Sequence, residues 1–295
     1  MQPTDMTRLC MSSLSSLPEM KKMAVSFSKE IPNANLRVIS LGAGVQSSVM
    51  ALMAAKGEIT PMPDCAIFAD TQYEPDGVYE HLKWLEERLP YPVHIVSVGN
   101  IKEHALKGEN KSGTKFVTMP FFTASGIGMR QCTNDYKIQP IRTKTRELLG
   151  LKKGQRAKDV LCETWIGISM DEIQRVKDNR DKYIINRWPL LELGMRRHHC
   201  HEWFDKHYPN KKLAKSACIA CPYHDNKLWR EMKINDPKSF NDAVVFDKAI
   251  RTQNTKNIEQ FVHSSLKPLS EVDFSTAEDK GQLNFLDECD GMCGV

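Results

Sequence analysis

The stretch that decides the fold is residues 36–48, LRVISLGAGVQSS. Residues 36–41 form a short, mostly apolar run that is typical of a buried strand, and a turn of small residues follows it. Apolar side chains then recur at helical spacing from Val49 until Gly57. This order predicts a strand, a glycine turn and a helix.

The same alternation continues along the chain. Further strands are predicted at 65–69, 93–98 and 165–169, and further helices at 76–89, 138–149 and 195–207. Strands that alternate with helices pair in parallel, so the sequence predicts an α/β fold, with a parallel twisted sheet and helices on both faces. The polar, glycine-rich stretch from Asn100 to Arg130 predicts a loop.

Length and composition place the chain among globular proteins. It has 295 residues, of which 41% are hydrophobic and 26% charged, which excludes collagen, coiled-coil and disordered classes. The net charge of +4 is too small to argue for a nucleic-acid or membrane partner. We expect a poorly ordered extension at 1–35, an α/β domain at 36–210 and a C-terminal appendage at 211–295.

Compartment is predicted from two further features. No stretch approaches the roughly 18 apolar residues of a membrane span, and residues 1–30 show no apolar block after a basic start. The nine cysteines are an odd number and are irregularly spread, which is a poor disulfide framework. We therefore expect a soluble, unsecreted, cytoplasmic protein.

The glycine turn is a candidate phosphate site. Its small residues let backbone N–H groups approach an anion at the N-terminus of a helix, and Ser47 and Ser48 add hydroxyl donors. A tight strand-to-helix turn would use the same glycines only to relieve crowding. Ligands bind at the carboxyl ends of parallel strands, which favours the phosphate site. Asp70 and Thr71 follow the next strand, although a plain turn would explain Asp70 nearly as well.

Together these motifs resemble the PP-loop superfamily of adenine-nucleotide enzymes, and within it the phosphoadenosine phosphosulfate (PAPS) and adenylyl-sulfate (APS) reductase family. The glycine turn is similar to the family's phosphate loop, and Asp70-Thr71 to its Asp-Thr at the end of strand two. Residues 167–175, GISMDEIQR, resemble its Gly-x-Arg-x-x-Glu-x-x-x-Arg segment, with Ser169 in place of the first arginine. Residues 188–190, WPL, resemble its Pro-Leu segment.

The resemblance implies an adenine nucleotide alpha hydrolase-like fold with a nucleotide site at the glycine turn. The implied nucleotide-binding residues are Ser40, Gly42, Gly44, Gln46, Ser47, Ser48, Asp70, Thr71 and Gly167. ATP-cleaving members of the superfamily carry Ser-Gly-Gly-x-Asp-Ser in this loop, whereas Gln46 stands at the position of the acid. A neutral amide does not hold Mg²⁺ as a carboxylate does. We therefore expect no Mg-ATP, and a preformed adenylyl sulfate as the small-molecule substrate.

The cysteines extend the resemblance. Residues 130–141, RQCTNDYKIQPI, resemble the reductases' Cys-Cys-x-x-x-Lys-Val-x-Pro-Leu segment, with Thr133 at the second cysteine. In cluster-bearing members this doublet joins a later Cys-x-x-Cys to hold a 4Fe-4S cluster. Cys132, Cys218 and Cys221 are the implied ligands here, with the fourth position open or filled by Cys200 or His224. Arg130, Lys137 and Arg175 are the implied sulfate-binding residues.

Zinc is the competing metal. The spacing Cys218-x2-Cys221-x2-His224, together with Cys132 or Cys200, would also satisfy a tetrahedral structural site. We prefer the cluster, and a site without any metal remains open as well.

The last nine residues, DECDGMCGV, resemble the reductases' C-terminal Glu-Cys-Gly segment. The resemblance implies that Cys289 attacks the sulfonate, forms a thiosulfonate and releases AMP or its 3′-phosphate. A thioredoxin- or glutaredoxin-like thiol donor would then release sulfite. Cys293 could instead form a resolving disulfide with Cys289, and a frayed tail with incidental thiols would explain the same residues.

The favoured function is therefore thiol-dependent reduction of PAPS or APS to sulfite. A rival is an iron–sulfur-dependent sulfurtransferase that thiolates a nucleotide or a nucleic-acid base, and only this reading involves a nucleic acid. A third is a zinc-stabilised nucleotide-binding module without catalysis. None of the three involves a membrane.

Overall fold

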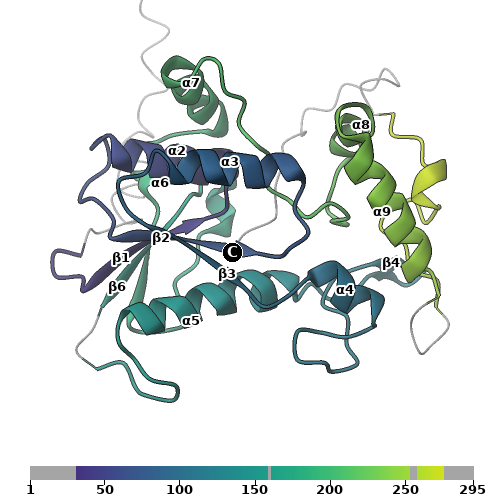
Figure 1. Ribbon diagram of the computed structural model, residues 1–295, viewed down its shortest axis with the longest axis horizontal. Coiled ribbons are helices and arrows are strands. Elements are labelled where there is room, and N and C mark those ends of the chain that lie inside the picture. Colours follow the sequence, from purple (N-terminus) through teal and green to yellow (C-terminus); the bar gives the residue numbers. More distant parts are fainter. Residues whose placement is uncertain (1–30, 159–160, 253–257, 276–295) are drawn as a thin grey trace, which may run out of the picture.

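The computed structural model describes residues 31–158, 161–252 and 258–275 (Figure 1). Most of the predicted N-terminal extension lies outside the described residues, as do Cys289 and Cys293 of the predicted reactive tail.

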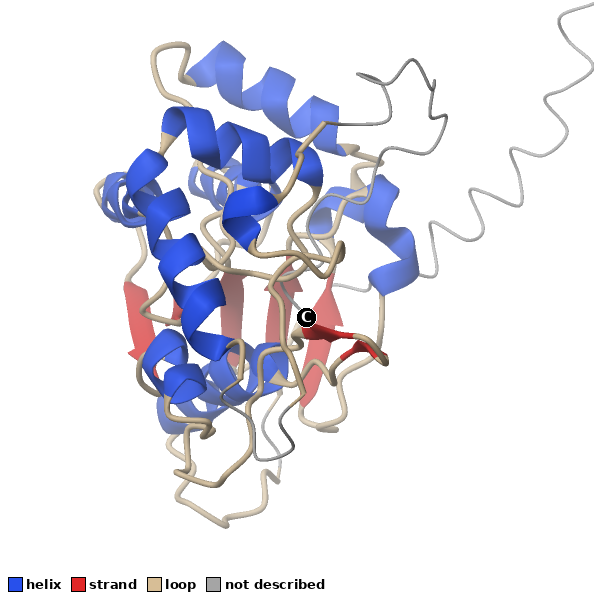
Figure 2. Ribbon diagram, turned by 90° about the vertical axis from the view of Figure 1, so that its right-hand side faces the viewer, coloured by secondary structure: helices blue, strands red, loops and turns tan. Residues whose placement is uncertain are grey.

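A five-stranded parallel sheet forms the centre of the fold (Figures 1 and 2). Its order is β3-β2-β1-β6-β7, and all four neighbouring pairs are parallel. The strands are β1 (Leu36–Leu41), β2 (Cys65–Asp70), β3 (Val93–Ser97), β6 (Cys162–Ile166) and β7 (Ile184–Arg187). The chain adds strands on one side of β1 and later on the other, so the sheet has a switch point between β1 and β6. Such points are where open α/β sheets bind ligands, beyond the carboxyl ends of the strands.

Helices cover both faces of this sheet, as the sequence predicts (Figure 1). One face carries α2 (Val45–Ala55), α3 (Asp76–Glu86), α6 (Pro189–Glu192) and α7 (Arg197–His207). The other carries the π-helical turn η2 (Asn134–Ile138) and α5 (Gln139–Leu148), which continues directly from it. Nine residues of α2 are buried, because this helix lies between β1 and the outer helix α7.

A second hydrophobic core joins two parts of the chain that are distant in sequence. The first part contains α4 (Ile101–Leu106) and a small hairpin of β4 (Phe122–Thr123) and β5 (Gly126–Ile127). The second contains α8 (Asn226–Asn235), α9 (Pro237–Ile250) and the 3-10 turn η4 (Leu269–Glu271). Buried side chains from both parts form this core, among them Phe121, Tyr136, Trp229 and Phe246. The segment expected as a C-terminal appendage therefore shares its core with the segment between β3 and α5.

The stretch 100–130 is more ordered than its composition predicts. The Asn100 side chain accepts hydrogen bonds from the backbone N–H groups of Lys102 (2.9 Å) and Glu103 (3.2 Å), which caps α4. Ile101 and Ala105 bury the inner face of this short helix. The prediction of an unbroken loop was wrong because the apolar partners of α4 come from α9, far along the chain.

None of the described helices is long and apolar enough to cross a membrane.

Candidate functional site

The glycine turn after β1 holds a residue in the left-handed region. Ala43 has φ +52° and is fully buried between Gly42 and Gly44. Non-glycine residues rarely adopt this conformation, which curls successive N–H groups toward one side as anion-binding backbone nests do. Within the described chain, no side chain caps the N-terminus of α2, and its first turn contains no acid. The N-terminus of α2 therefore keeps the partial positive charge of the helix dipole.

The serines of the turn are placed differently from each other. The Ser47 hydroxyl accepts a hydrogen bond from the Gly42 N–H (3.2 Å) and donates to the Gly44 carbonyl (3.3 Å), which braces the turn. Ser48 is fully buried, and its hydroxyl lies 3.0 Å from Nε2 of His81 on α3. Burial lowers the pKa of His81 to about 4. The Ser48 hydroxyl thus contacts a neutral core histidine.

The carboxyl end of β6 closes against the same turn. A Cβ built on Gly167 would lie 2.8 Å from the Ser47 backbone nitrogen and 2.9 Å from its Cα, so only glycine fits there. Beyond it, the 3-10 turn η3 (Met170–Arg175) places Glu172 beside the glycine turn, where it accepts a hydrogen bond from Gln46 (3.2 Å). Burial raises the pKa of Glu172, and Arg175 forms an ion pair with this carboxylate. Arg175 therefore lies on the glycine-turn side of the site.

The end of β2 combines a turn-forming acid with a buried hydroxyl. One Asp70 oxygen accepts hydrogen bonds from the Gln72 N–H (2.7 Å) and the Tyr79 hydroxyl (2.9 Å), which builds the turn at Gln72, where φ is +56°. Thr71 is almost fully buried, and its Oγ1 lies 3.3 Å from the Cys218 sulfur. Residues 71 and 218, far apart in sequence, thus meet just beyond the carboxyl end of β2.

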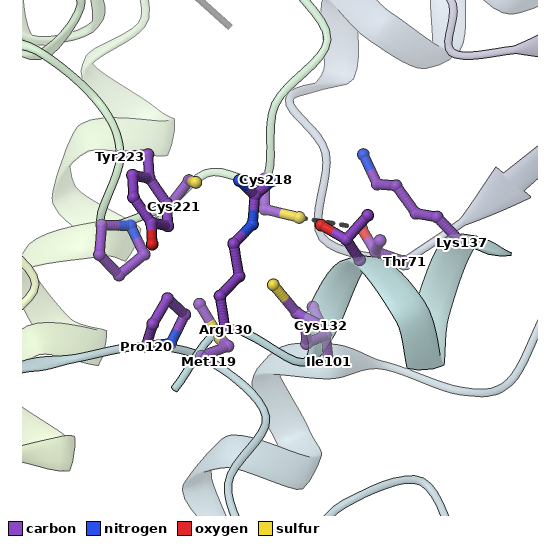
Figure 3. Close-up of a pocket in the computed structure, with 12 residues that line it drawn as sticks. Thr71, Ile101, Met119, Pro120, Arg130, Cys132, Lys137, Cys218, Cys221 and Tyr223 are labelled. Atoms are coloured by element: carbon purple, nitrogen blue, oxygen red, sulfur yellow. Dashed lines mark hydrogen bonds between the residues drawn. The ribbon is translucent and has the colours of Figure 1, made fainter. Parts of the chain in front are cut away.

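Cys132, Cys218 and Cys221 line one pocket, together with Thr71, Arg130 and Lys137 (Figure 3). Its other lining residues are Ile101, Met119, Pro120, Thr133, Pro222 and Tyr223. Figure 3 shows the sulfurs of Cys132 and Cys218 directed toward a common space. The pocket brings together six of the residues that the sequence singles out.

Backbone contacts fix the cysteines. The Cys221 N–H donates to the Cys218 carbonyl (3.0 Å), which forms the tight turn of the Cys-x-x-Cys segment, and the Ile219 N–H donates to the Tyr73 carbonyl (2.8 Å). The Cys132 N–H donates to the Thr118 carbonyl (3.1 Å). Two separate segments are thereby held against the end of β2.

Charged groups surround these thiols. The Arg130 guanidinium lies over the Tyr223 ring, 4.8 Å from its centroid. The Lys137 Nζ lies 3.6 Å from Oε1 of Glu74, a carboxylate that is only 3% exposed. Sequence analysis missed Glu74 and Tyr223, and the only available signal for Glu74 was an acid shortly after Asp70-Thr71. The pocket combines thiols with cations, which suits an anionic sulfur compound.

The two candidate fourth ligands occupy different places. Cys200 is buried on α7 within the core around α2, a different core from that of Cys218 and Cys221. Burial raises its pKa to about 12. His224 follows the Cys-x-x-Cys turn, is 8% exposed, and lies 4.7 Å from the Trp229 ring. Neither ring nitrogen of His224 has a hydrogen-bond partner among the described residues, and burial lowers its pKa to about 3.

The chemistry of this donor set fits a thiophilic metal group. Three thiols at one pocket suit an iron–sulfur cluster or zinc, and a neutral buried imidazole suits zinc in particular. As the side chains lie, no group of three or more His, Cys, Asp or Glu within the described chain is placed to hold a metal ion. Binding of a metal group would therefore require the side chains to turn toward one another.

Comparison with known proteins finds matches among solved structures. No protein-family model matches the sequence, and no curated protein matches it. Among solved structures, the chain is similar to the phosphoadenylyl-sulfate (PAPS) reductase from Candida auris in its phosphate complex, with 15% sequence identity and a TM-score of 0.38. The similarity covers 67% of this chain and 86% of that one. These values are too low to assign an activity or a family.

Proposed function

We propose that this protein reduces an adenylyl sulfate, PAPS or APS, to sulfite and AMP or its 3′-phosphate. The observation that carries the proposal is the pocket in which Thr71, at the end of β2, meets Arg130, Lys137 and three thiols. A sulfonate needs cations to balance its charge and a thiol to attack its sulfur. This pocket supplies the cations beside the strand end where a nucleotide would lie.

The glycine turn would bind the phosphate of the nucleotide. The N-terminus of α2 has no side-chain cap and follows the left-handed Ala43, and both features are typical of backbone sites that bind an anion. A Cβ built on Gly44 would lie 3.6 Å from the Cβ of Ser216, only two residues before Cys218. The proposed phosphate site and the thiol pocket are therefore neighbours.

Arg130 and Lys137 would bind the sulfo group while the Cys289 thiolate attacks its sulfur. A bond forms between the Cys289 sulfur and the sulfonate, and the bond from sulfur to the phosphate oxygen breaks, which releases AMP or its 3′-phosphate. A dithiol of the thioredoxin or glutaredoxin class then attacks the Cys289 sulfur and releases sulfite. That donor becomes a disulfide and thereby supplies the two electrons of the reduction.

Cys132, Cys218 and Cys221 would hold the 4Fe-4S cluster that the sequence resemblance implies. When bound, such a cluster would supply a redox-active centre beside the sulfo group. Zinc held by the same thiols would instead stabilise the second core.

One observation favours the sulfurtransferase as a second candidate. Gln46 removes the acid from the glycine turn, but its amide donates to Glu172, so a carboxylate does lie next to the turn. A carboxylate at this place could take part in binding Mg²⁺ with ATP. Titration of the full chain with Mg-ATP and with each adenylyl sulfate separates the two functions.

The proposal is tested by anaerobic purification, quantification of iron, sulfide and zinc, and incubation with PAPS or APS and a reduced dithiol. We expect sulfite release, and we expect Cys289→Ser to abolish it while leaving AMP affinity intact. Cys10→Ser is the matched control, because it makes the same replacement of a thiol by a hydroxyl at a cysteine to which no role is assigned. Full turnover by Cys289→Ser would remove the assigned nucleophile, and absence of sulfite with both substrates would remove the proposed function.

A further inference from the structure

Glu74 is a buried carboxylate at which three segments of the chain meet. Its Oε1 accepts hydrogen bonds from the Thr71 hydroxyl (3.3 Å) and the Cys218 thiol (3.7 Å), and its Oε2 accepts one from the Ser216 hydroxyl (3.5 Å). The Lys137 Nζ lies 3.6 Å from Oε1. These partners come from the end of β2, the Cys-x-x-Cys segment and η2.

A charge in this position is costly. An ionised carboxylate removed from water loses several kcal/mol of solvation unless its partners compensate for it. The partners of Glu74 are all long contacts, and the 3.6 Å separation from Lys137 exceeds the roughly 2.7–2.9 Å of a direct charge-assisted hydrogen bond. Glu74 and Lys137 therefore do not form a tight ion pair. The arrangement instead places one cation and one thiol beside the same carboxylate oxygen.

Lys137 also connects the Glu74 carboxylate to the segment that carries Cys132. It belongs to η2, which begins at Asn134, two residues after Cys132. Single π-helical turns occur frequently at functional sites, and here the turn presents Lys137 to Glu74 from a segment that also carries a pocket cysteine. A change in the charge of Glu74 would therefore reach Lys137 directly.

We propose that Glu74 is a positioning residue whose charge holds Lys137 and the Cys218 turn at the end of β2, so that the lysine meets the sulfo group of the bound nucleotide. The inference rests on the proposed function and adds a determinant of substrate specificity to it. Glu74 acts through Lys137 and does not itself touch the substrate.

A purely structural role makes a different prediction. A carboxylate that only stabilises the second core would, when replaced, lower the free energy of unfolding and leave the folded protein equally selective. Selectivity between an adenylyl sulfate and AMP depends on the sulfo group, so it reports on Arg130 and Lys137 and not on general damage, and a Lys137→Gln background isolates the lysine.

The experiment compares the dissociation constants of APS and AMP for the full chain by calorimetry. We expect Glu74→Gln to reduce the preference for APS about tenfold, the value of one charge-assisted contact, and to change AMP affinity little. In a Lys137→Gln background the same substitution should have no further effect, because the partner through which it acts is gone. Should Glu74→Gln fail to fold, Glu74→Asp keeps the charge but shortens the reach, and we expect it to lose part of the preference.

Glu163→Gln is the matched control. Glu163 is a fully buried glutamate in the first half of β6, and it pairs with Arg187 at 3.5 Å. Its replacement should lower stability and leave the preference unchanged.

The outcomes separate the inference from the proposed function. Wild-type preference for APS in Glu74→Gln, or an undiminished effect in the Lys137→Gln background, would overturn the role of Glu74 alone. If the wild-type protein distinguishes neither APS from AMP nor PAPS from the 3′-phosphate of AMP, the proposed function fails and the inference fails with it.

Discussion

Replacement of Gly167 by alanine tests whether the end of β6 and the glycine turn form one site. The added Cβ would lie 2.8 Å from the Ser47 nitrogen and 2.9 Å from its Cα. Both atoms belong to the backbone at the start of α2, so no side-chain rotation relieves the contact. Either β6 or the glycine turn must move.

The size of the effect follows from this crowding. One methyl group forced into a closely packed region costs about 1–3 kcal/mol, and relaxation here requires displacement of the turn. A melting temperature lower by about 2–4 °C per kcal/mol is expected for a large domain. Because the displaced N–H groups are the proposed phosphate donors, AMP affinity should fall together with stability.

Chemical denaturation and AMP calorimetry on Gly167→Ala measure both effects. Gly77→Ala is the control, because nothing lies within 4 Å of a Cβ built on Gly77 and this residue lies in α3. That variant should gain about 0.5–1 kcal/mol from the reduced entropy of its unfolded chain and should bind AMP normally. Wild-type stability and AMP affinity in Gly167→Ala would refute the close approach of β6 to the turn.

Two further predictions concern the thiols and the pH dependence of stability. Cys218→Ala should remove any brown chromophore of the anaerobically purified protein, whereas Cys200→Ala, in the other core, should keep it; unchanged absorbance in Cys218→Ala would remove this ligand assignment. The pKa of His81 is about 4 in the folded protein and 6.5 in the unfolded chain. As the pH falls from 6.5 to 4, only the unfolded chain therefore binds this proton. The free energy of unfolding should drop by up to about 1.4 kcal/mol per pH unit in this range. Urea unfolding from pH 7.5 to 4.5 should show that the free energy of unfolding falls less steeply with decreasing pH in His81→Gln than in the wild type. Equal dependence on pH in the two proteins would contradict the assignment.

The first three strands were predictable because they carry their own signal, whereas the strand expected at 165–169 begins three residues after the start of β6. The expected strand at 36–41 coincides with β1, and the expected strands at 65–69 and 93–98 differ from β2 and β3 by one residue. β1 and β2 are largely apolar because both faces of a parallel sheet are covered. β7 gave no usable signal, since it is four residues long and one of them, Ile185, is exposed.

The candidate site was predictable in its residue types more than in its connections. The resemblance singled out Cys132 and the Cys-x-x-Cys segment, and the structure places them around one pocket; their roles remain proposals. Glu74 had no such signal, because its importance comes from partners at positions 137, 216 and 218. A buried ion contact between distant segments has no local sequence pattern.

The arrangement of the thiols separates two kinds of cysteine in this chain. Cys65, Cys162 and Cys200 lie in apolar cores, and burial raises their pKa values to about 11, 12 and 12, which keeps them as unreactive thiols. Cys218 is also buried but lines the pocket, where it contacts the Thr71 hydroxyl and the Glu74 carboxylate. Cys218 therefore differs from the three core cysteines in its place at the pocket.

A series of residue contacts connects the glycine turn to the thiol pocket. Gly44 lies against Ser216, the Ser216 hydroxyl donates to Glu74, and Glu74 contacts both Thr71 and Cys218. These contacts join three segments of the chain, so displacement of the glycine turn would shift the Cys-x-x-Cys segment as well. For this reason Gly167→Ala should impair sulfite release more than it impairs AMP binding, and equal losses in the two measurements would show that the turn and the thiols act independently.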